Sequence, residues 1–174
     1  VYERQAQECF RHMDQVKRFG SIGSGIIGAG WAGRALSVGM DVYAFDPEQG
    51  AEARLRKKID QIWPVLERTG VFPDASKDRL VFCKSVEAVA AQSDFIQESA
   101  PEPTDLKVEL HAQIDAAAPP DVVAASSTSG LLPTDFQAKC QHPERVIAGH
   151  PCNPGYLLTL VEVSGGKQTS TETV

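Results

Sequence analysis

Three glycines near the start of the chain have the spacing of a turn that holds phosphate groups. In the run FGSIGSGIIG, Gly23, Gly25 and Gly28 follow a short apolar stretch in the order G-x-G-x-x-G. The first glycine permits a tight bend, the second lets the backbone approach a pyrophosphate, and the third lets a helix pack closely on the strand. A helix that begins at Ile26 or Ile27 would direct its free N–H groups at the phosphates.

An acidic residue follows this turn at the distance expected for a ribose contact. Asp46 lies 18 residues after Gly28 and closes a second apolar run at 42–45. A carboxylate at this point hydrogen-bonds a ribose hydroxyl of NAD and disfavours the 2′-phosphate of NADP. Because no arginine directly follows Asp46, the sequence favours NAD. A glycine-rich turn without a ligand is the alternative interpretation.

Three polar side chains further along could move a proton beside a bound nicotinamide. They are Ser129 in the serine run 126–130, His150 before a proline, and Glu162 in the last apolar stretch. Hydride transfer from a hydroxyl needs a base near neutral pH, which suits histidine. A carboxylate would orient the imidazole, and a hydroxyl would hold the substrate oxygen. On spacing alone the alternatives stay open: a loop histidine, a solvated edge glutamate and serines that cap a helix.

These side chains need a framework of alternating strands and helices. Apolar runs that predict strands stand at 42–45, 80–83, 94–97, 122–125, 146–148 and 157–163, and helical stretches stand at 29–39, 47–69, 85–91 and 104–118. This alternation predicts an α/β, Rossmann-type doubly wound fold, with a mostly parallel sheet and helices on both faces. Apolar residues at helical spacing predict a helical extension over 1–17 before a nucleotide-binding domain at 18–174.

Net charge, the length of the apolar stretches and the cysteine spacing limit the classes of partner and the location of the protein. The 174 residues carry a net charge of −6, which argues against nucleic acid or an anionic membrane as a partner. No apolar stretch approaches the length of a bilayer span. The cysteines, at 9, 83, 140 and 152, have neither disulfide nor metal-site spacing, so we expect reduced thiols, a cytoplasmic location and no metal.

The same motifs resemble the 3-hydroxyacyl-CoA dehydrogenase superfamily. The resemblance runs from about residue 19 to the end and includes the glycine turn, the serine run and the segment HPCNP at 150–154. Within the superfamily, SSTSGLLP at 126–133 and QESAPE at 97–102 look most like the members that oxidise L-carnitine to 3-dehydrocarnitine. The implied activity is NAD-dependent oxidation of the 3-hydroxyl of a small hydroxy acid. A 3-hydroxyacyl-CoA dehydrogenase and an L-gulonate dehydrogenase-like enzyme are the alternatives.

The resemblance implies roles for individual residues. His150 matches the catalytic histidine, Glu162 its paired glutamate, and Ser129 the serine that contacts substrate and cofactor. The positions implied to bind NAD are Gly23, Ser24, Gly25, Ile26, Ile27, Gly28, Asp46, Glu102, Lys107, Ser129 and Asn153. Cys152, Gly155 and Thr159 depart from the carnitine-type pattern, so the pocket wall is expected to differ there.

The resemblance further implies a second, C-terminal helical domain, which these 174 residues do not contain. That domain closes the substrate cleft and supplies most of the dimer contact in the family. We therefore expect a homodimer for the full-length protein. The isolated chain could be an NAD-binding module that is inactive without the second domain.

Other polar and aromatic side chains have structural explanations that compete with function. We expect packing roles for Trp31, Trp63 and Cys152, and a solvated helical face for Arg54, Arg56, Lys57 and Lys58. Tyr156 could pack or could contact a quaternary ammonium group. His12, His111 and His142 are expected at the surface.

Overall fold

The computed structural model of the chain describes residues 16–174, so the predicted helical extension over 1–17 lies almost wholly outside the described residues. One sheet organises the fold, with the strand order β3-β2-β1-β4-β5-β6-β7. Its strands are β1 (Arg18–Ile22), β2 (Asp41–Phe45), β3 (Leu80–Phe82), β4 (Phe95–Glu98), β5 (Val123–Ser126), β6 (Val146–Pro151) and β7 (Val161–Gly165). Strands β1 to β6 are parallel and β7 is antiparallel to β6.

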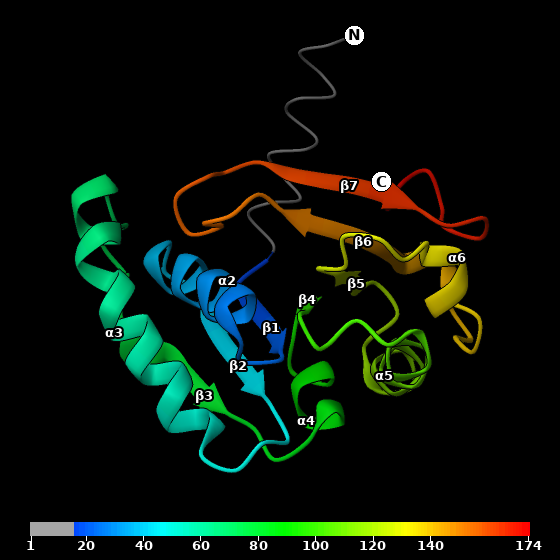
Figure 1. The fold of residues 1–174 in the computed structure, drawn as a ribbon, viewed down its shortest axis with the longest axis horizontal. Helices are drawn as coiled ribbons and strands as arrows, with labels where there is room; N and C mark the ends of the chain where they lie inside the picture. Colours follow the sequence, from blue (N-terminus) through cyan, green and yellow to red (C-terminus); the bar gives the residue numbers. More distant parts are fainter. Residues whose placement is uncertain (1–15) are drawn as a thin grey trace, which may run out of the picture.

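Helices cover both faces of the sheet (Figure 1). They are α2 (Ile26–Ser37), α3 (Ala51–Thr69), α4 (Val86–Ala90), α5 (Thr104–Ala117) and the short α6 (Pro133–Phe136), with 3-10 turns at Lys77–Arg79 and Pro143–Arg145. The predicted doubly wound α/β fold is thereby confirmed. Within residues 16–174, every helix is too short or too polar to span a bilayer.

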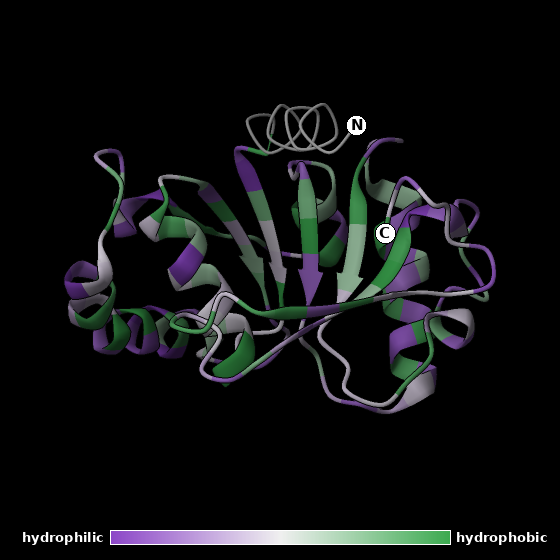
Figure 2. Ribbon diagram, turned by 90° about the horizontal axis from the view of Figure 1, so that it is seen from above, coloured by the Kyte–Doolittle hydropathy of each residue, from purple (hydrophilic) through white to green (hydrophobic). Residues whose placement is uncertain are grey.

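The alternation of side chains along the strands divides the core into two layers. Phe19 of β1 and Val42 of β2 pack with α2 and α3, whereas Ile22 and Ile96 pack with α4 and α5. Successive residues of a strand point to opposite faces, so one strand serves both layers. The helical ribbons alternate between apolar and polar bands, as expected of helices with one buried face (Figure 2).

Two helix boundaries have local causes. The first helix begins at Ile26, as the glycine turn predicts and ahead of the helical stretch at 29–39, and it ends before Gly39, whose φ of +83° a side-chain-bearing residue rarely adopts. The second helix begins at Ala51, after Gly50 at φ +74°, so residues 47–50 form a loop.

The strand predicted at 157–163 was misplaced, because the strand is β7 at Val161–Gly165. Its register is set by antiparallel pairing with β6, and Leu157, Leu158 and Leu160 belong to the connection between them. These leucines are 39%, 48% and 63% exposed, so their apolar character does not reflect burial in the sheet. An apolar run therefore predicted a strand where the side chains instead form an exposed patch.

A buried ion pair fixes the start of β6. Arg145 Nη2 lies 2.8 Å from Asp115 Oδ1 and also donates to the Asp115 carbonyl at the end of α5. Burial acts to raise the pKa of Asp115, but the Arg145 side chain and the N–H groups of His142 and Gln141 outweigh it and lower that pKa. The pair ties α5 to β6, the strand that carries His150.

Candidate active site

The predicted functional residues gather at the carboxyl edge of the parallel strands. In the sheet register Ile22 of β1 stands beside Phe45 of β2 and Glu98 of β4, and Glu98 stands beside Ser126 of β5. The glycine turn, Asp46 and the serine run therefore leave neighbouring strands at one edge. The order of the sheet reverses direction between β1 and β4, which is the point where open α/β sheets bind ligands.

The glycine turn has the conformation that its spacing predicts. Gly23 has φ +92°, and a Cβ there would lie 2.6 Å from the Ser99 carbonyl oxygen. A Cβ on Gly28 would overlap the Gly23 carbonyl oxygen, which confirms that the third glycine permits close packing. A Cβ on Gly25 would meet no atom within 4 Å. The first turn of α2 has no side-chain cap and no acidic residue, so its N–H groups face this open space.

A pair of alanine substitutions separates the two roles of these glycines. Gly28→Ala is expected to destabilise the domain by about 1–3 kcal/mol, since the added methyl group overlaps a backbone carbonyl. Gly25→Ala should cost less than about 1 kcal/mol but should weaken NAD binding, because its methyl group enters the open space before α2. Urea denaturation and NAD calorimetry on both variants check this. Equal stability losses would contradict the assignment.

Asp46 closes the glycine turn from the neighbouring strand. Its Oδ2 accepts hydrogen bonds from the N–H and hydroxyl of Ser24, both at 2.8 Å, and Oδ1 accepts one from the N–H of Glu48 at 2.9 Å. Partial burial acts to raise the pKa of Asp46, but these hydrogen bonds and the charge of Arg54 outweigh it and lower that pKa. Asp46 is therefore an anion at neutral pH.

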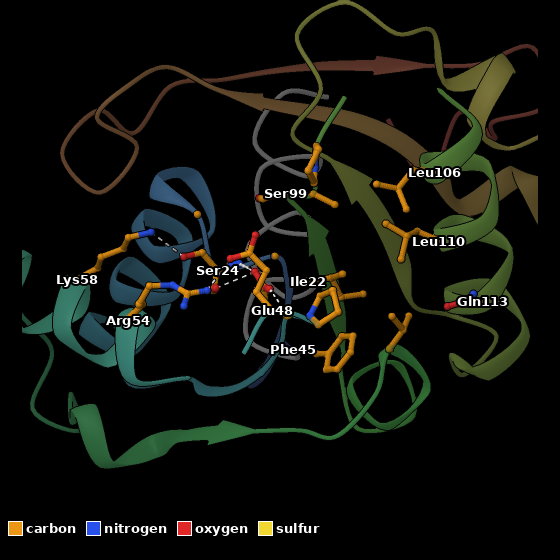
Figure 3. A pocket seen from close by; sticks show the side chains of 17 residues that line it. Ile22, Ser24, Phe45, Glu48, Arg54, Lys58, Ser99, Leu106, Leu110 and Gln113 are labelled. Carbon is orange, nitrogen blue, oxygen red and sulfur yellow. Dashed lines mark hydrogen bonds and ion pairs between the residues drawn. The ribbon is translucent and has the colours of Figure 1, made fainter. Parts of the chain in front are cut away.

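A pocket of about 660 Å³ opens between Asp46 and α5. Figure 3 shows Leu106 and Leu110 of α5 facing Ile22 and Phe45 across the pocket, while charged side chains gather around Ser24. An apolar slot beside a carboxylate suits the adenosine half of a dinucleotide. The open glycine turn and the uncapped helix adjoin the same pocket, so the residues present fit NAD.

The predicted solvated face of α3 is confirmed for Arg54, Arg56 and Lys57, which are exposed, whereas Lys58 is partly buried. Arg56 pairs with Glu52 as a surface residue would, but Arg54 and Lys58 line the pocket. Lys58 Nζ donates to the Ser24 carbonyl oxygen at 2.9 Å. The signal that could have revealed them is their spacing of four residues, which places both side chains on the same helix face.

Glu102 joins the loop after β4 to the serine run after β5. Its carboxylate accepts a hydrogen bond from the Thr128 hydroxyl at 2.8 Å and one from the Ser129 N–H at 3.2 Å. The serine run does not cap α6, whose N-cap is Leu132 with no side-chain cap. The alternative of a simple helix cap is therefore excluded, and Ser129 is held at the carboxyl edge with its side chain exposed.

His150 and Glu162 form a cross-strand pair. His150 lies within β6, not in the loop after it, and stands directly opposite Glu162 of β7 in the register. Its Nδ1 lies 2.8 Å from Glu162 Oε2. The side chains are 34% and 72% exposed, so the pair is open on one side. Because Nδ1 is committed to the carboxylate, Nε2 is the ring nitrogen left to exchange a proton with a ligand.

Comparison with known proteins identifies the family. Residues 18–174 match the protein family described as 3-hydroxyacyl-CoA dehydrogenase, NAD binding domain. The chain belongs to this family. The L-carnitine dehydrogenase of Pseudomonas putida is 54% identical over 160 residues, which are 92% of this chain and 50% of that enzyme. The enzyme of that name from Streptomyces coelicolor is 47% identical over 161 residues, 92% of this chain and 51% of its own.

Solved structures of other dehydrogenases have the same fold. The 3-hydroxybutyryl-CoA dehydrogenase of Escherichia coli superposes with a TM-score of 0.82 at 31% identity, covering 91% of this chain and 34% of that one. The NAD⁺-dependent 5-formyl-3-hydroxy-2-methylpyridine 4-carboxylic acid 5-dehydrogenase superposes with a TM-score of 0.83 at 29% identity, covering 91% and 52%. The chain spans about half the length of the curated relatives that it matches.

Seven positions predicted to bind NAD do not line this pocket: Ile26, Ile27, Gly28, Glu102, Lys107, Ser129 and Asn153. Lys107 is 1% exposed, and its Nζ lies 2.9 Å from Glu98 Oε1 beneath the loop that carries Glu102. Asn153 is exposed in the connection between β6 and β7. Their contact with NAD stays a prediction.

The structure contains a buried polar cluster that the sequence did not predict. Glu98 is fully buried, pairs with Lys107, accepts from the Ala100 N–H at 2.6 Å and binds the Ser126 hydroxyl. The prediction of a surface position for His111 is wrong, because this residue is fully buried with Nε2 3.5 Å from Glu98 Oε2. The signal was the spacing of Lys107 and His111, four residues apart on the face of α5 that packs on the sheet.

Trp31 and Trp63 have the packing roles predicted for them. Trp31 stacks on Phe19 with ring centroids 6.1 Å apart, and Trp63 packs against the same core cluster. Tyr156 lies over α2, where a Cβ on Gly30 would be 3.8 Å from its ring. His142 is at the surface as predicted, with its side chain 54% exposed, whereas His12 lies outside the described residues.

Proposed function

We propose that this chain is the cofactor-binding half of an NAD-dependent dehydrogenase that oxidises the 3-hydroxyl of a small hydroxy acid, with L-carnitine as the substrate. The observation that carries the proposal is the His150–Glu162 pair, which adjoins the edge of the sheet that carries the glycine turn and Asp46. A base with an orienting carboxylate beside a nucleotide site is what alcohol oxidation requires.

Each residue has a separate role in the proposed reaction. Bound NAD supplies the hydride acceptor. His150 Nε2 takes the proton of the 3-hydroxyl, and Glu162 stabilises the resulting imidazolium through Nδ1. Ser129 holds the substrate oxygen, since Glu102 positions its backbone at the end of β5. The glycine turn from Gly23 to Gly28 holds the pyrophosphate and Asp46 the ribose, with Glu102, Lys107 and Asn153 as further contacts.

The names of the relatives support L-carnitine as the substrate, at 54% identity over their N-terminal half. We retain two alternative substrates. The solved relatives include a 3-hydroxybutyryl-CoA dehydrogenase at 31% identity, so a 3-hydroxyacyl-CoA is the second candidate. An L-gulonate-like substrate is the third. The basic residues on α3 do not favour CoA, because Arg54 and Lys58 belong to the nucleotide pocket and Arg56 is paired.

A partner surface is required to complete the substrate site. Leu157, Leu158 and Leu160 are exposed in the connection that follows His150, and Leu132 near the serine run is 66% exposed. Exposed apolar residues beside a polar site mark an interface. We propose that a C-terminal helical domain covers them, that the full-length protein is a cytoplasmic homodimer, and that the isolated chain binds NAD without turnover.

Turnover assays on two lengths of the protein test this proposal. The 174-residue chain should bind NAD in calorimetry with no effect of L-carnitine, whereas a chain extended through a C-terminal domain should reduce NAD with L-carnitine. Free CoA should not inhibit the extended chain. Reduction of NAD with 3-hydroxybutyryl-CoA and inhibition by CoA would favour the second candidate. No turnover with any 3-hydroxy acid would contradict the proposal.

A further inference from the structure

A buried glutamine amide joins β4 to β6 and to the serine run. Gln97 lies near the end of β4 and is 1% exposed. Its Nε2 donates to the Ser127 hydroxyl at 2.7 Å and to the Gly149 carbonyl oxygen at 2.9 Å. Both N–H groups of the amide are used in this way, and a carbonyl oxygen can only accept, so the amide nitrogen must face Gly149. The residue before His150 is therefore tied to β4.

The bond to Gly149 is made where β6 has lost its partner strand on one side. The pairing of β5 with β6 ends with Ser126 opposite Ala148, while β6 continues to Pro151. Within residues 16–174, the last part of β6 pairs with β7 alone. The Gly149 carbonyl and the His150 N–H share one peptide plane, so a hydrogen bond to this carbonyl restrains the strand where it carries His150.

Small residues give the Gln97 side chain room to reach across β5. Gln97 stands beside Ala125 of β5 in the register, and Ala125 stands beside Ile147 of β6. A Cβ on Gly149 would lie 3.3 Å from the Ala125 Cβ and 3.4 Å from Gln97 Oε1. Larger side chains at 125 or 149 would therefore crowd the amide in this close-packed region.

The second hydrogen bond of the amide restrains the serine run. The Ser127 hydroxyl also lies 2.9 Å from the Ser99 hydroxyl, and the Ser127 N–H donates to the Glu98 carbonyl oxygen at 2.7 Å. Ser129 follows two residues later in the same run. The amide of Gln97 thus contacts both segments that carry the residues assigned to the substrate hydroxyl.

We propose that Gln97 is a positioning residue, which sets the place of His150 relative to Ser129. This inference rests on the proposed function, in which His150 takes the hydroxyl proton and Ser129 holds the substrate oxygen. Gln97 does not line the nucleotide pocket, so its loss should slow proton transfer without changing cofactor binding. A displacement of about 1 Å in a catalytic group can lower the rate by about a hundredfold.

Kinetics of the extended, catalytically competent protein test this role. Gln97→Met keeps the length of the side chain and removes both donors. It should lower kcat with L-carnitine by about 10- to 100-fold, while the Kd for NAD stays within about twofold of the native value. In a His150→Gln background, Gln97→Met should lower kcat by less than about twofold more, because residues that act through one step are not additive.

A second buried glutamine provides the matched control. Gln137 is also 1% exposed, and its Nε2 donates to the Pro143 carbonyl oxygen at 2.7 Å, near the opposite end of β6. Gln137→Met therefore removes the same kind of hydrogen bond away from His150. It should lower the Tm about as much as Gln97→Met does, but kcat should stay within about twofold of the native value.

Three results would overturn the proposal. The first is native kcat in Gln97→Met, the second is an undiminished further loss in the His150→Gln background, and the third is an equal loss of kcat in Gln137→Met. Should circular dichroism show Gln97→Met to be unfolded, Gln97→Leu makes the same comparison with a shorter apolar side chain. Native kcat in His150→Gln alone would instead contradict the proposed function, so the two failures are distinct.

Discussion

Replacing His150 by glutamine in the extended, catalytically competent protein is expected to lower kcat by about a thousandfold, while the Kd for NAD stays within about twofold of the native value. Glutamine keeps a polar side chain of similar reach but cannot accept the hydroxyl proton at neutral pH. The nucleotide pocket does not include His150, so cofactor binding should not change. Steady-state kinetics with L-carnitine and calorimetry with NAD provide the two measurements.

The companion variants separate chemistry from folding. Glu162→Gln keeps the cross-strand contact but removes the charge that stabilises the imidazolium, so a smaller loss of kcat is expected. His142→Gln changes an exposed histidine elsewhere in the chain and should leave kcat unchanged. Native turnover by His150→Gln would show that another group accepts the proton, and the assignment of the base would then be wrong.

Replacing Lys107 by methionine is expected to lower the free energy of unfolding by about 3–5 kcal/mol. The side chains of Lys107 and Glu98 are 1% and 0% exposed, so the substitution would leave a carboxylate buried without its cation. Lys139→Met, which removes the exposed partner of Glu109, is the matched control and should cost less than about 1 kcal/mol. Equal losses in the two variants would show that the buried pair has no special role in stability.

The pH dependence of unfolding tests the same pair. Burial acts to raise the pKa of Glu98, but His111, Lys107 and Ser126 outweigh it and lower that pKa from 4.5 to about 2. A carboxyl whose pKa is lower in the folded state stabilises the fold above its unfolded pKa. Native stability should therefore fall as the pH decreases from 4.5 to about 2. The double variant Glu98→Gln/Lys107→Met should show a smaller fall, because Asp46 and Asp115, whose pKa values are also lowered, keep their share of it. A slope as steep as that of the native chain would contradict the assignment.

Much of the nucleotide site could be predicted from local sequence. Gly23, Gly28 and Asp46 are constrained by backbone conformation, by contact within one βαβ unit and by position at a strand end, and all three constraints have short sequence signatures. The strands of a parallel sheet are equally predictable because they are buried on both faces and read as apolar runs.

The side chains that join distant segments were harder to predict. The sequence predicted a surface position for His111, because its helix contains both polar and apolar residues. The packing of α5 on the sheet instead places His111 beside Glu98. The sequence predicted a solvated helix face for Arg54 and Lys58. Because α3 approaches the glycine turn, both side chains also line the pocket. The strand after His150 was misplaced because its apolar flank is exposed, so burial and apolarity do not coincide there.

By itself the sequence determined the fold class, the glycine turn and its acid, because each depends on residues close together in the chain. The tertiary structure alone decided the distances that matter for chemistry. The His150–Glu162 contact depends on an antiparallel register between β6 and β7, and the Asp46–Ser24 contact depends on two strands lying side by side. Such pairings join residues far apart in the chain, and their geometry follows from how whole elements pack.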